Sequence, residues 1–256
     1  MTTILQVTDV KLAFGGVKAL DGVTFDVPEG KIVGLIGPNG AGKTTLFDCI
    51  SGYQRPDSGS ITLDGTLDLV GLPPHERVTH GIGRLFQQAR LFPSVTIRDV
   101  LRTVQHRRMK AGMFRSVLGL SRNEEREATT QADEALELVG LSAHADKPAM
   151  ELSTGMLRLC ELAAIVVVRP RLLLLDEPSS GIAQKETEAL LPLLKRLRDH
   201  LDATVLVIEH DMPLVMGLAD RIVAMASGKV LTEGTPAVVQ RHPDVLASYL
   251  GTRAAR

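Results

Sequence analysis

The segment that most constrains this chain is a glycine-rich loop between an apolar strand and a helix. Residues 37–45 fit the pattern GxxxxGK[ST], with a buried strand expected at residues 31–36 and a helix from Lys43 to a capping Gly52. Glycines let consecutive backbone amides turn toward a phosphate, and the helix N-terminus adds a favourable dipole. The pattern predicts a phosphate-binding loop, with a glycine-rich turn without a ligand as the alternative. The expected contacts are Gly37, Pro38, Asn39, Gly40, Ala41, Gly42, Lys43, Thr44 and Thr45.

Length and composition narrow the class of protein further. The 256 residues can bury a large core without disulfides, and 29 Lys and Arg against 30 Asp and Glu argue against an extended nucleic-acid surface, so no nucleic-acid partner is expected. Cys49 and Cys160 match neither a metal site nor a disulfide framework, which indicates small core residues in a reducing compartment. The longest apolar run, residues 162–168, is far shorter than the roughly 18 residues of a membrane span. With no secretory signal pattern at the start, cytoplasmic residence is expected.

The first part of the chain predicts a small antiparallel β-subdomain. Short apolar runs alternate with turn signals at residues 15–16, 21–22 and 28–30. A further strand at residues 60–64 is expected to return to the same subdomain.

From residue 95 to residue 149 the chain changes to helical spacing with dense charge. A capping-box pattern at residues 121–124 predicts a helix that ends near Gly140. Apolar helices then alternate with solidly apolar strands, which is typical of a parallel α/β sheet. The expected segments are a helix at 154–168, a strand at 172–175, a helix at 184–200 and a strand at 204–208. A hairpin over residues 221–233 and a last helix from Thr235 follow.

An acidic pair, Asp176 and Glu177, follows the four-leucine strand. In α/β sheets the carboxyl ends of the strands border the crevice in which ligands bind. Asp176 is predicted to hold Mg²⁺ through water, together with the Thr44 hydroxyl, while Lys43 neutralises the β and γ oxygens of a nucleotide. Glu177 is placed to orient or deprotonate an attacking water. The alternative is a solvated turn after a core strand.

Two further features are candidates for the same site. His210 directly follows an apolar strand, so its imidazole is expected beside the γ-phosphate, although a lone histidine is more often structural. Ser153 is a natural N-cap for a largely apolar helix, and Gly155 allows close approach of a backbone or an anion. An ordinary capped core helix is the alternative for this second feature.

In its order of motifs, the sequence resembles the ATP-binding subunit of ABC transporters. The motifs are the glycine-rich loop, Phe86-Gln87, the Leu152–Met156 segment, the four leucines with Asp176-Glu177, and His210. The resemblance implies an α/β fold: a P-loop NTPase core with a parallel sheet, an N-terminal antiparallel β-subdomain and an inserted α-helical subdomain. It also implies a single nucleotide-binding domain over residues 1–256, with the helical subdomain at about residues 95–165.

The resemblance also assigns roles to residues whose function the spacing of the motifs alone does not indicate. Phe14 looks like the aromatic that stacks on adenine, and Gln87 looks like the loop glutamine that meets Mg²⁺ and contacts the membrane partner. In a head-to-tail dimer, Ser153 and Gly155 of one subunit contact the γ-phosphate bound by the other. The sequence departs from the usual pattern at Thr154, Met156 and Ala183, which stand where the family usually has glycine, glutamine and aspartate. Because Lys43, Gln87, Asp176, Glu177 and His210 stand where the family needs them, an active, Mg²⁺-dependent ATPase is expected.

Residues 14–20, 105–127 and 242–251 are similar to the ATPases of branched-chain amino acid-type importers. The resemblance implies separate transmembrane permeases, a second ATPase subunit in a homodimer or heterodimer, and indirectly a solute-binding protein. It places the chain peripherally on the cytoplasmic face of the plasma membrane. An export-type ABC ATPase, a soluble switch acting on nucleic acid or the ribosome, and a structural protein with a vestigial loop are the alternatives. The basic stretch at residues 102–122 fits either a solvated helical face or an approach to anionic headgroups.

Overall fold

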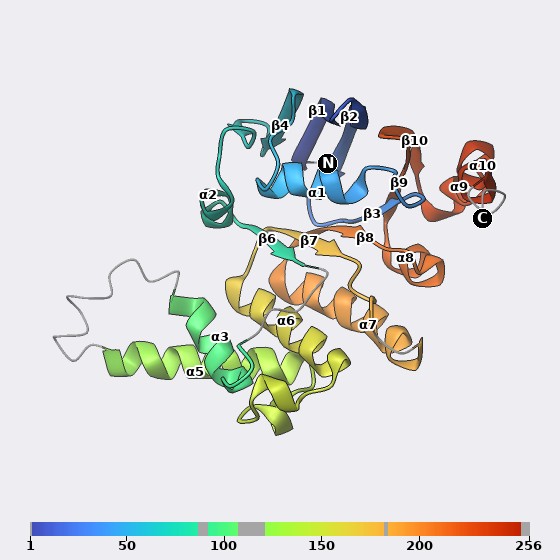
Figure 1. Ribbon diagram of the computed structural model, residues 1–256. Coiled ribbons are helices and arrows are strands. Elements are labelled where there is room, and N and C mark those ends of the chain that lie inside the picture. Colours follow the sequence, from blue (N-terminus) through green and yellow to red (C-terminus); the bar gives the residue numbers. More distant parts are fainter. Residues whose placement is uncertain (1, 87–91, 107–120, 182–183, 252–256) are drawn as a thin grey trace.

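The computed structural model describes residues 2–86, 92–106, 121–181 and 184–251. Two sheets and their covering helices make up this part of the chain (Figure 1). The predicted site residue Gln87 and the departure at Ala183 lie outside the described residues, as do the side chains of the capping-box pattern at residues 121–124.

The first sheet is antiparallel and has the strand order β2-β1-β4-β5. Its strands are β1 Thr3–Phe14, β2 Val17–Pro28, β4 Ser58–Leu63 and β5 Leu67–Asp68. The predicted subdomain is therefore present, and the return of the strand near residue 60 is confirmed by its pairing with β1. The turn expected at residues 21–22 is wrong. Both residues lie inside β2, where Val10 pairs with Val23 and Lys11 with Asp21, so Gly22, at φ +86°, is the extra residue of a β-bulge.

The second sheet has the order β10-β9-β3-β8-β7-β6, with β6, β7, β8, β3 and β9 parallel and β10 antiparallel at one edge. Its strands are β3 Ile32–Ile36, β6 Ile82–Leu85, β7 Leu172–Asp176, β8 Thr204–Ile208, β9 Arg221–Ala226 and β10 Lys229–Gly234. The predicted parallel sheet and the C-terminal hairpin are confirmed. Strand β6 was not anticipated, because its sequence Ile-Gly-Arg-Leu is short and contains a glycine and an arginine.

Most of the described helices lie in the connections between strands, whereas α9 and α10 follow the last strand. They are α1 Lys43–Ser51, α2 Pro74–Thr79, α3 Ile97–His106, α5 Ser121–Leu138, α6 Thr154–Val168, α7 Gln184–Leu201, α8 Met212–Leu218, α9 Pro236–Val239 and α10 Pro243–Gly251. Short 3₁₀ turns occupy Ser142–His144 and Ala149–Glu151. The single last helix expected from Thr235 is instead divided into α9 and α10. Proline disfavours a helical backbone at the residue before it, so the helix cannot run through His242 into Pro243.

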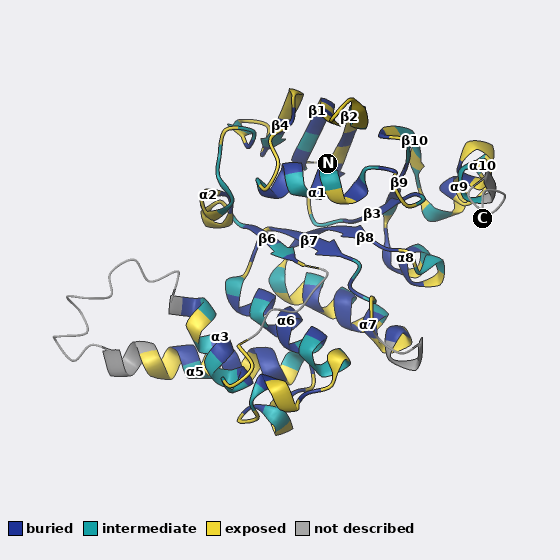
Figure 2. Cartoon of the chain, in the orientation of Figure 1, coloured by how far each residue is buried: buried dark blue, intermediate teal, exposed yellow. Residues whose placement is uncertain are grey.

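The central sheet is buried on both faces because alternate side chains of each strand enter different cores. Leu172 and Leu174 of β7 pack with α1 and the antiparallel sheet, whereas Leu173 and Leu175 pack with α6 and α7. Figure 1 shows the same layers, with α1 between the two sheets and α6 and α7 on the opposite face. In Figure 2 the strands β3, β7 and β8 are buried throughout and β6 and β9 over most of their length, whereas the edge strand β10 has no buried residue. In the part of the chain that the structure describes, no helix is long and apolar enough to cross a membrane.

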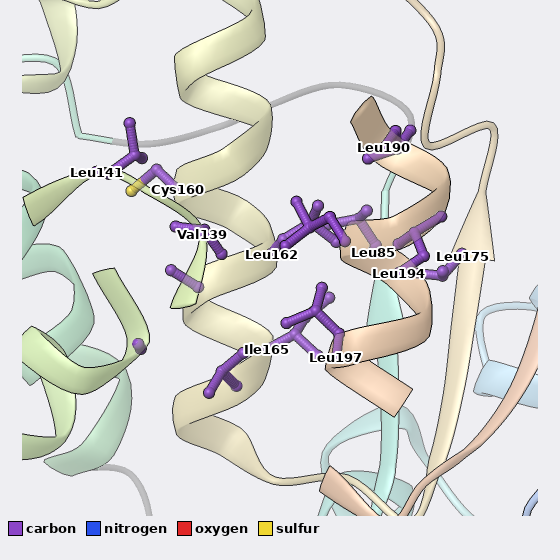
Figure 3. Packing of buried hydrophobic residues seen from close by; sticks show 14 of the residues in the cluster. Leu85, Val139, Leu141, Cys160, Leu162, Ile165, Leu175, Leu190, Leu194 and Leu197 are labelled. Atoms are coloured by element: carbon purple, nitrogen blue, oxygen red, sulfur yellow. The ribbon is translucent and has the colours of Figure 1, made fainter. Parts of the chain in front are cut away.

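Helix α6 packs at the centre of the larger helical core. Figure 3 shows it between Val139 and Leu141 on one side and Leu194 and Leu197 of α7 on the other. Cys160 of α6 is fully buried and has a free thiol, as predicted. The helices of the segment between β6 and β7 are thus joined to the sheet through α6.

Candidate functional site

The glycine-rich loop joins β3 to α1, and its shape requires glycine at two positions. Gly37 and Gly42 have φ values of +153° and +97°. A Cβ at Gly37 would lie 2.1 Å from the Met225 carbonyl oxygen, and one at Gly42 would lie 2.4 Å from the Ala19 carbonyl oxygen. At these two positions the loop lies against β9 and β2 with no space for a side chain, which constrains the path of its backbone.

Lys43 begins α1 and points back into this loop. Its ammonium donates to the Gly37 carbonyl at 2.8 Å and to the Pro38 carbonyl at 3.1 Å, and the residue is 6% exposed. Burial lowers the pKa of Lys43, and the negative charges of Glu177 and Asp176 oppose that shift. The helix has no side-chain N-cap, because Gly42 occupies that position. Its first amides are therefore not satisfied by a capping side chain, and the Lys43 ammonium lies at the loop that precedes them, an arrangement that suits a phosphate.

Asp176 ends β7 and forms an ion pair with Arg84 of β6, at 3.1 Å between carboxylate and guanidinium. Arg84 also binds Asp48 of α1 at 2.6 Å, and its guanidinium lies 4.9 Å from the centre of the Phe86 ring. Burial raises the pKa of Asp176, while the charge and hydrogen bond of Arg84 lower it. Arg84 thus favours the ionised carboxylate at the position where a metal ligand is predicted.

Glu177 and His210 are in contact, as their positions after neighbouring strands predict. The His210 Nε2 atom lies 2.9 Å from Glu177 Oε1, with the side chains 40% and 20% exposed. Glu177 has a left-handed backbone, at φ +49°, which is strained for a residue with a Cβ. Its amide donates to the Ile208 carbonyl at 2.9 Å. The ends of β7 and β8 therefore hold an acid and an imidazole together at the solvent boundary.

A buried carboxylate supports both of these loops. Glu209 is 1% exposed and accepts hydrogen bonds from three backbone amides, those of Ser179 at 2.8 Å, His210 at 2.9 Å and Asp211 at 3.2 Å. It therefore ties the loop after β7 to the loop after β8. Nothing in the sequence near Glu209 distinguishes it, because its partner at Ser179 is 30 residues away.

The remaining predicted residues lie in different places. Thr44 in the first turn of α1 is exposed, and Phe14 at the end of β1 is 48% exposed. Ser153 caps α6 as expected, accepting from the Met156 amide at 3.3 Å, and Gly155 lies in the first turn of that helix. Among the described residues, no hydrogen bond or ion pair connects Ser153 or Gly155 with the glycine-rich loop. The structure thus joins Lys43, Asp176, Glu177 and His210 at one site, and the roles of these residues remain predictions.

The fold, with its glycine-rich loop between β3 and α1, is that of an ATP-binding cassette, and the chain belongs to the ABC transporter family. The family described as "ABC transporter" matches residues 20–180. A second, described as "Branched-chain amino acid ATP-binding cassette transporter", matches residues 229–255. The chain is an ATP-binding subunit of an ABC transporter, and such subunits are ATPases. The predicted family is therefore confirmed.

Particular relatives match over almost their whole length. The high-affinity branched-chain amino acid transport ATP-binding protein LivG of Salmonella typhimurium is 42% identical over 250 residues, 97% of this chain and 98% of that protein. The corresponding protein BraF of Pseudomonas aeruginosa is 43% identical over 252 residues, again 97% and 98%.

Solved structures confirm the fold class. An ATP-binding cassette of an ABC transporter in its ADP conformation superposes with a TM-score of 0.83 at 28% identity, covering 98% of this chain and all of that one. The cbiO1 protein of Clostridium perfringens, part of an ABC transporter complex, gives 0.80 at 26% identity, covering 96% and 94%.

Proposed function

We propose that this chain binds Mg-ATP at the glycine-rich loop and hydrolyses it to drive a separate membrane permease. The observation that carries the proposal is the contact between Glu177 and His210 beside the buried Lys43. In this assignment Lys43 and the loop amides bind the phosphates, and Glu177 takes the proton from the attacking water. His210 fixes the orientation of the Glu177 carboxylate. Phe14, on the exposed end of β1, stacks on the adenine.

The residues around the loop also fit a magnesium ion. The Thr44 hydroxyl is exposed at the first turn of α1, and the ionised form of Asp176 is supported by Arg84. Hydroxyl and carboxylate oxygens are the hard ligands that Mg²⁺ takes, usually with several waters and the substrate phosphates. Gln87 completes the proposed set. Bound Mg²⁺ would neutralise charge that develops on the phosphate oxygens.

The proposed hydrolytic unit is a head-to-tail dimer with a second ATPase subunit, identical or different. Ser153 and Gly155 begin a 15-residue helix whose N-terminal dipole favours an anion. Ser153, the N-cap, and Thr154 are exposed, although most of α6 from Arg158 onward is buried, so this helix end is available to the γ-phosphate bound by a partner subunit. Each site would then be completed by two chains. The whole chain, residues 1–256, acts in this proposal as one nucleotide-binding domain with its helical subdomain at about residues 95–165.

The proposed permease contact is a groove of about 650 Å³ beside the edge strand β6. Apolar atoms of α3 and α6 line it, including Val100, Val104 and Ala164, and the exposed rings of Phe86 and Phe92 lie among its lining. Exposed apolar side chains gathered at a groove are typical of a protein-binding surface. The position of Phe86 directly before Gln87 connects this surface with the nucleotide site.

By similarity to LivG and BraF, the proposed cargo is a branched-chain amino acid or a related small solute that enters the cell. A solute-binding protein would deliver it to the permease, and the chain would act at the cytoplasmic face of the plasma membrane. Co-purification of a permease of this class with the tagged chain tests the assignment of partner.

The variant Glu177→Gln tests the assigned chemistry. It keeps the size of the side chain and removes its ability to accept the proton of water. We expect phosphate release to fall by about 100-fold or more, in the range that a general base contributes, with the affinity for Mg-ATP retained. Glu188→Gln, which removes an exposed carboxylate on α7, is the matched control and should turn over normally. Near-normal turnover by Glu177→Gln would overturn the assignment.

A further inference from the structure

The strongest unexplained feature outside the nucleotide contacts is a buried arginine on α6. Arg158 lies on the second turn of this helix, and its side chain is 5% exposed. It forms an ion pair at 2.9 Å with Glu161, one turn further along, whose side chain is 10% exposed. Burial raises the pKa of Glu161, and the hydrogen bond and charge of Arg158 oppose that shift. A buried ion pair is costly to desolvate, so its other contacts decide what it does.

Apart from Glu161, the groups that accept hydrogen bonds from Arg158 are backbone carbonyl oxygens in two other segments of the chain. Arg158 Nη2 donates to Asp176 at 3.1 Å and to Glu177 at 3.0 Å, and Nε donates to Pro178 at 3.2 Å. Nη1 donates to Phe86 at 2.5 Å as well as to the Glu161 carboxylate. A guanidinium has five N–H donors in a fixed planar arrangement, and each of the five has an acceptor here.

Three of these acceptors are consecutive carbonyls, and the middle one belongs to Glu177. The backbone of Glu177 is in the left-handed region, so the turn that aims its side chain at His210 is not the one its sequence prefers. Strained conformations persist where the surroundings determine them. Arg158 contributes to that determination, beside the bond of the Glu177 amide to Ile208, because its planar donors can be satisfied only when the three carbonyls converge.

We infer that Arg158 is a positioning residue for the proposed base, and that it couples the N-terminal part of α6 to the orientation of Glu177. The same guanidinium binds Phe86, the last described residue before residues 87–91, so it connects three segments: α6, the loop after β7 and the end of β6. A shift of α6 would therefore be transmitted to the carboxylate that handles the proton. This inference rests on the proposed role of Glu177.

The test compares turnover with stability in the full-length chain. Arg158→Met removes the donors, and the double variant Arg158→Met with Glu161→Leu also removes the carboxylate that would be left buried without its partner. We expect kcat to fall about 10- to 100-fold in both variants, as misplacement by about 1 Å does, while the dissociation constant for Mg-ATP changes less than about twofold. The double variant should recover part of the lost Tm and none of the lost kcat. Arg158→Lys, with three donors, should give an intermediate kcat.

Arg77 provides a matched control. It is 2% exposed, and its guanidinium also donates to backbone carbonyls, those of Cys49 and Ile50 near the C-terminal end of α1 and that of Leu72 before α2. Arg77→Met should lower Tm and leave the kcat of the folded protein within about twofold of wild type, because no carbonyl near the acidic pair is lost.

The two possible failures give different results. A kcat near wild type in Arg158→Met, or a kcat that recovers together with Tm in the double variant, would show a purely structural residue and overturn the inference. Glu177→Gln is measured in the same assay. If that variant turns over normally, the assigned role of Glu177 fails, whatever Arg158 does.

Discussion

The substitution Glu209→Gln perturbs the site without touching any predicted nucleotide contact. The carboxylate of Glu209 receives three backbone amides, one on Oε1 from Ser179 and two on Oε2 from His210 and Asp211. Glutamine has one acceptor oxygen. When that oxygen keeps the two amides on the side of His210, the new NH₂ group faces the Ser179 amide, and two donors then oppose each other in a buried position.

The expected loss of stability follows from these contacts. One charge-assisted hydrogen bond, worth about 1.5–3 kcal/mol, disappears, and two others weaken by about 1 kcal/mol each as the acceptor becomes neutral. The sum is about 4 kcal/mol. For a chain of this size, each kcal/mol lowers Tm by about 2–4 °C, so the substitution should lower Tm by about 8–16 °C. Because His210 follows Glu209 directly, kcat should also fall, by about tenfold or more.

Thermal unfolding monitored by circular dichroism, followed by phosphate release measured well below the transition, checks both parts. The exposed Glu188→Gln serves as the matched charge control and should change the free energy of unfolding by less than about 0.5 kcal/mol. A Tm for Glu209→Gln within about 2 °C of wild type would refute the reasoning, since the three amides would then not depend on the charged acceptor.

Two further predictions concern titrating groups. Arg84→Met removes the charge that lowers the pKa of Asp176, so that pKa should rise further. The acidic limb of the pH profile of kcat should then move to higher pH. A pH–rate titration at saturating Mg²⁺ checks this, and an acidic limb that does not move would contradict it. Burial raises the pKa of the Cys49 and Cys160 thiols to about 12, so at pH 8 only about one molecule in ten thousand carries a thiolate at either site. A thiol reagent should therefore label neither cysteine in the folded chain and both in denaturant, and rapid labelling of the native protein would show that a core opens.

Much of the fold could be predicted from local patterns. The bounds of α6 and β8 agree with the sequence expectation. Each is an apolar segment whose ends are marked by a cap or a turn, and such a segment forms a buried helix or strand between those marks. Strand β6 could not be predicted in the same way. It is defined by pairing with β7, 90 residues away in sequence at Ile82 and Leu172, and not by its own composition. The bulge at Gly22 was mistaken for a turn, since both use a glycine with positive φ.

The residues of the candidate site likewise fall into two groups, those that a local sequence pattern predicted and those that it did not. Lys43, Asp176 and His210 were found because each lies at a fixed distance from a strand end, and the parallel sheet places those ends together. Arg84, Arg158 and Glu209 were missed. Each of them has at least one partner in a segment far away in sequence, and no local pattern reveals a carbonyl 72 residues away, as for Arg158 and Phe86.

The helices of residues 97–168 form a connection between two strands that are already neighbours, with Leu85 paired to Leu175. Because β6 and β7 are parallel, their pairing requires a crossover of about a dozen residues or more but sets no upper limit on the length of the chain between them. Closing a loop twice as long costs only about 0.6 kcal/mol in chain entropy. Insertions and deletions can accumulate in this connection over evolution while the sheet and its acidic pair stay unchanged, provided that the α6 surface against α7 and β7 is kept. If the proposed permease contact on α3 and α6 holds, one ATPase core could thus serve permeases of different shape by changes in a single connection.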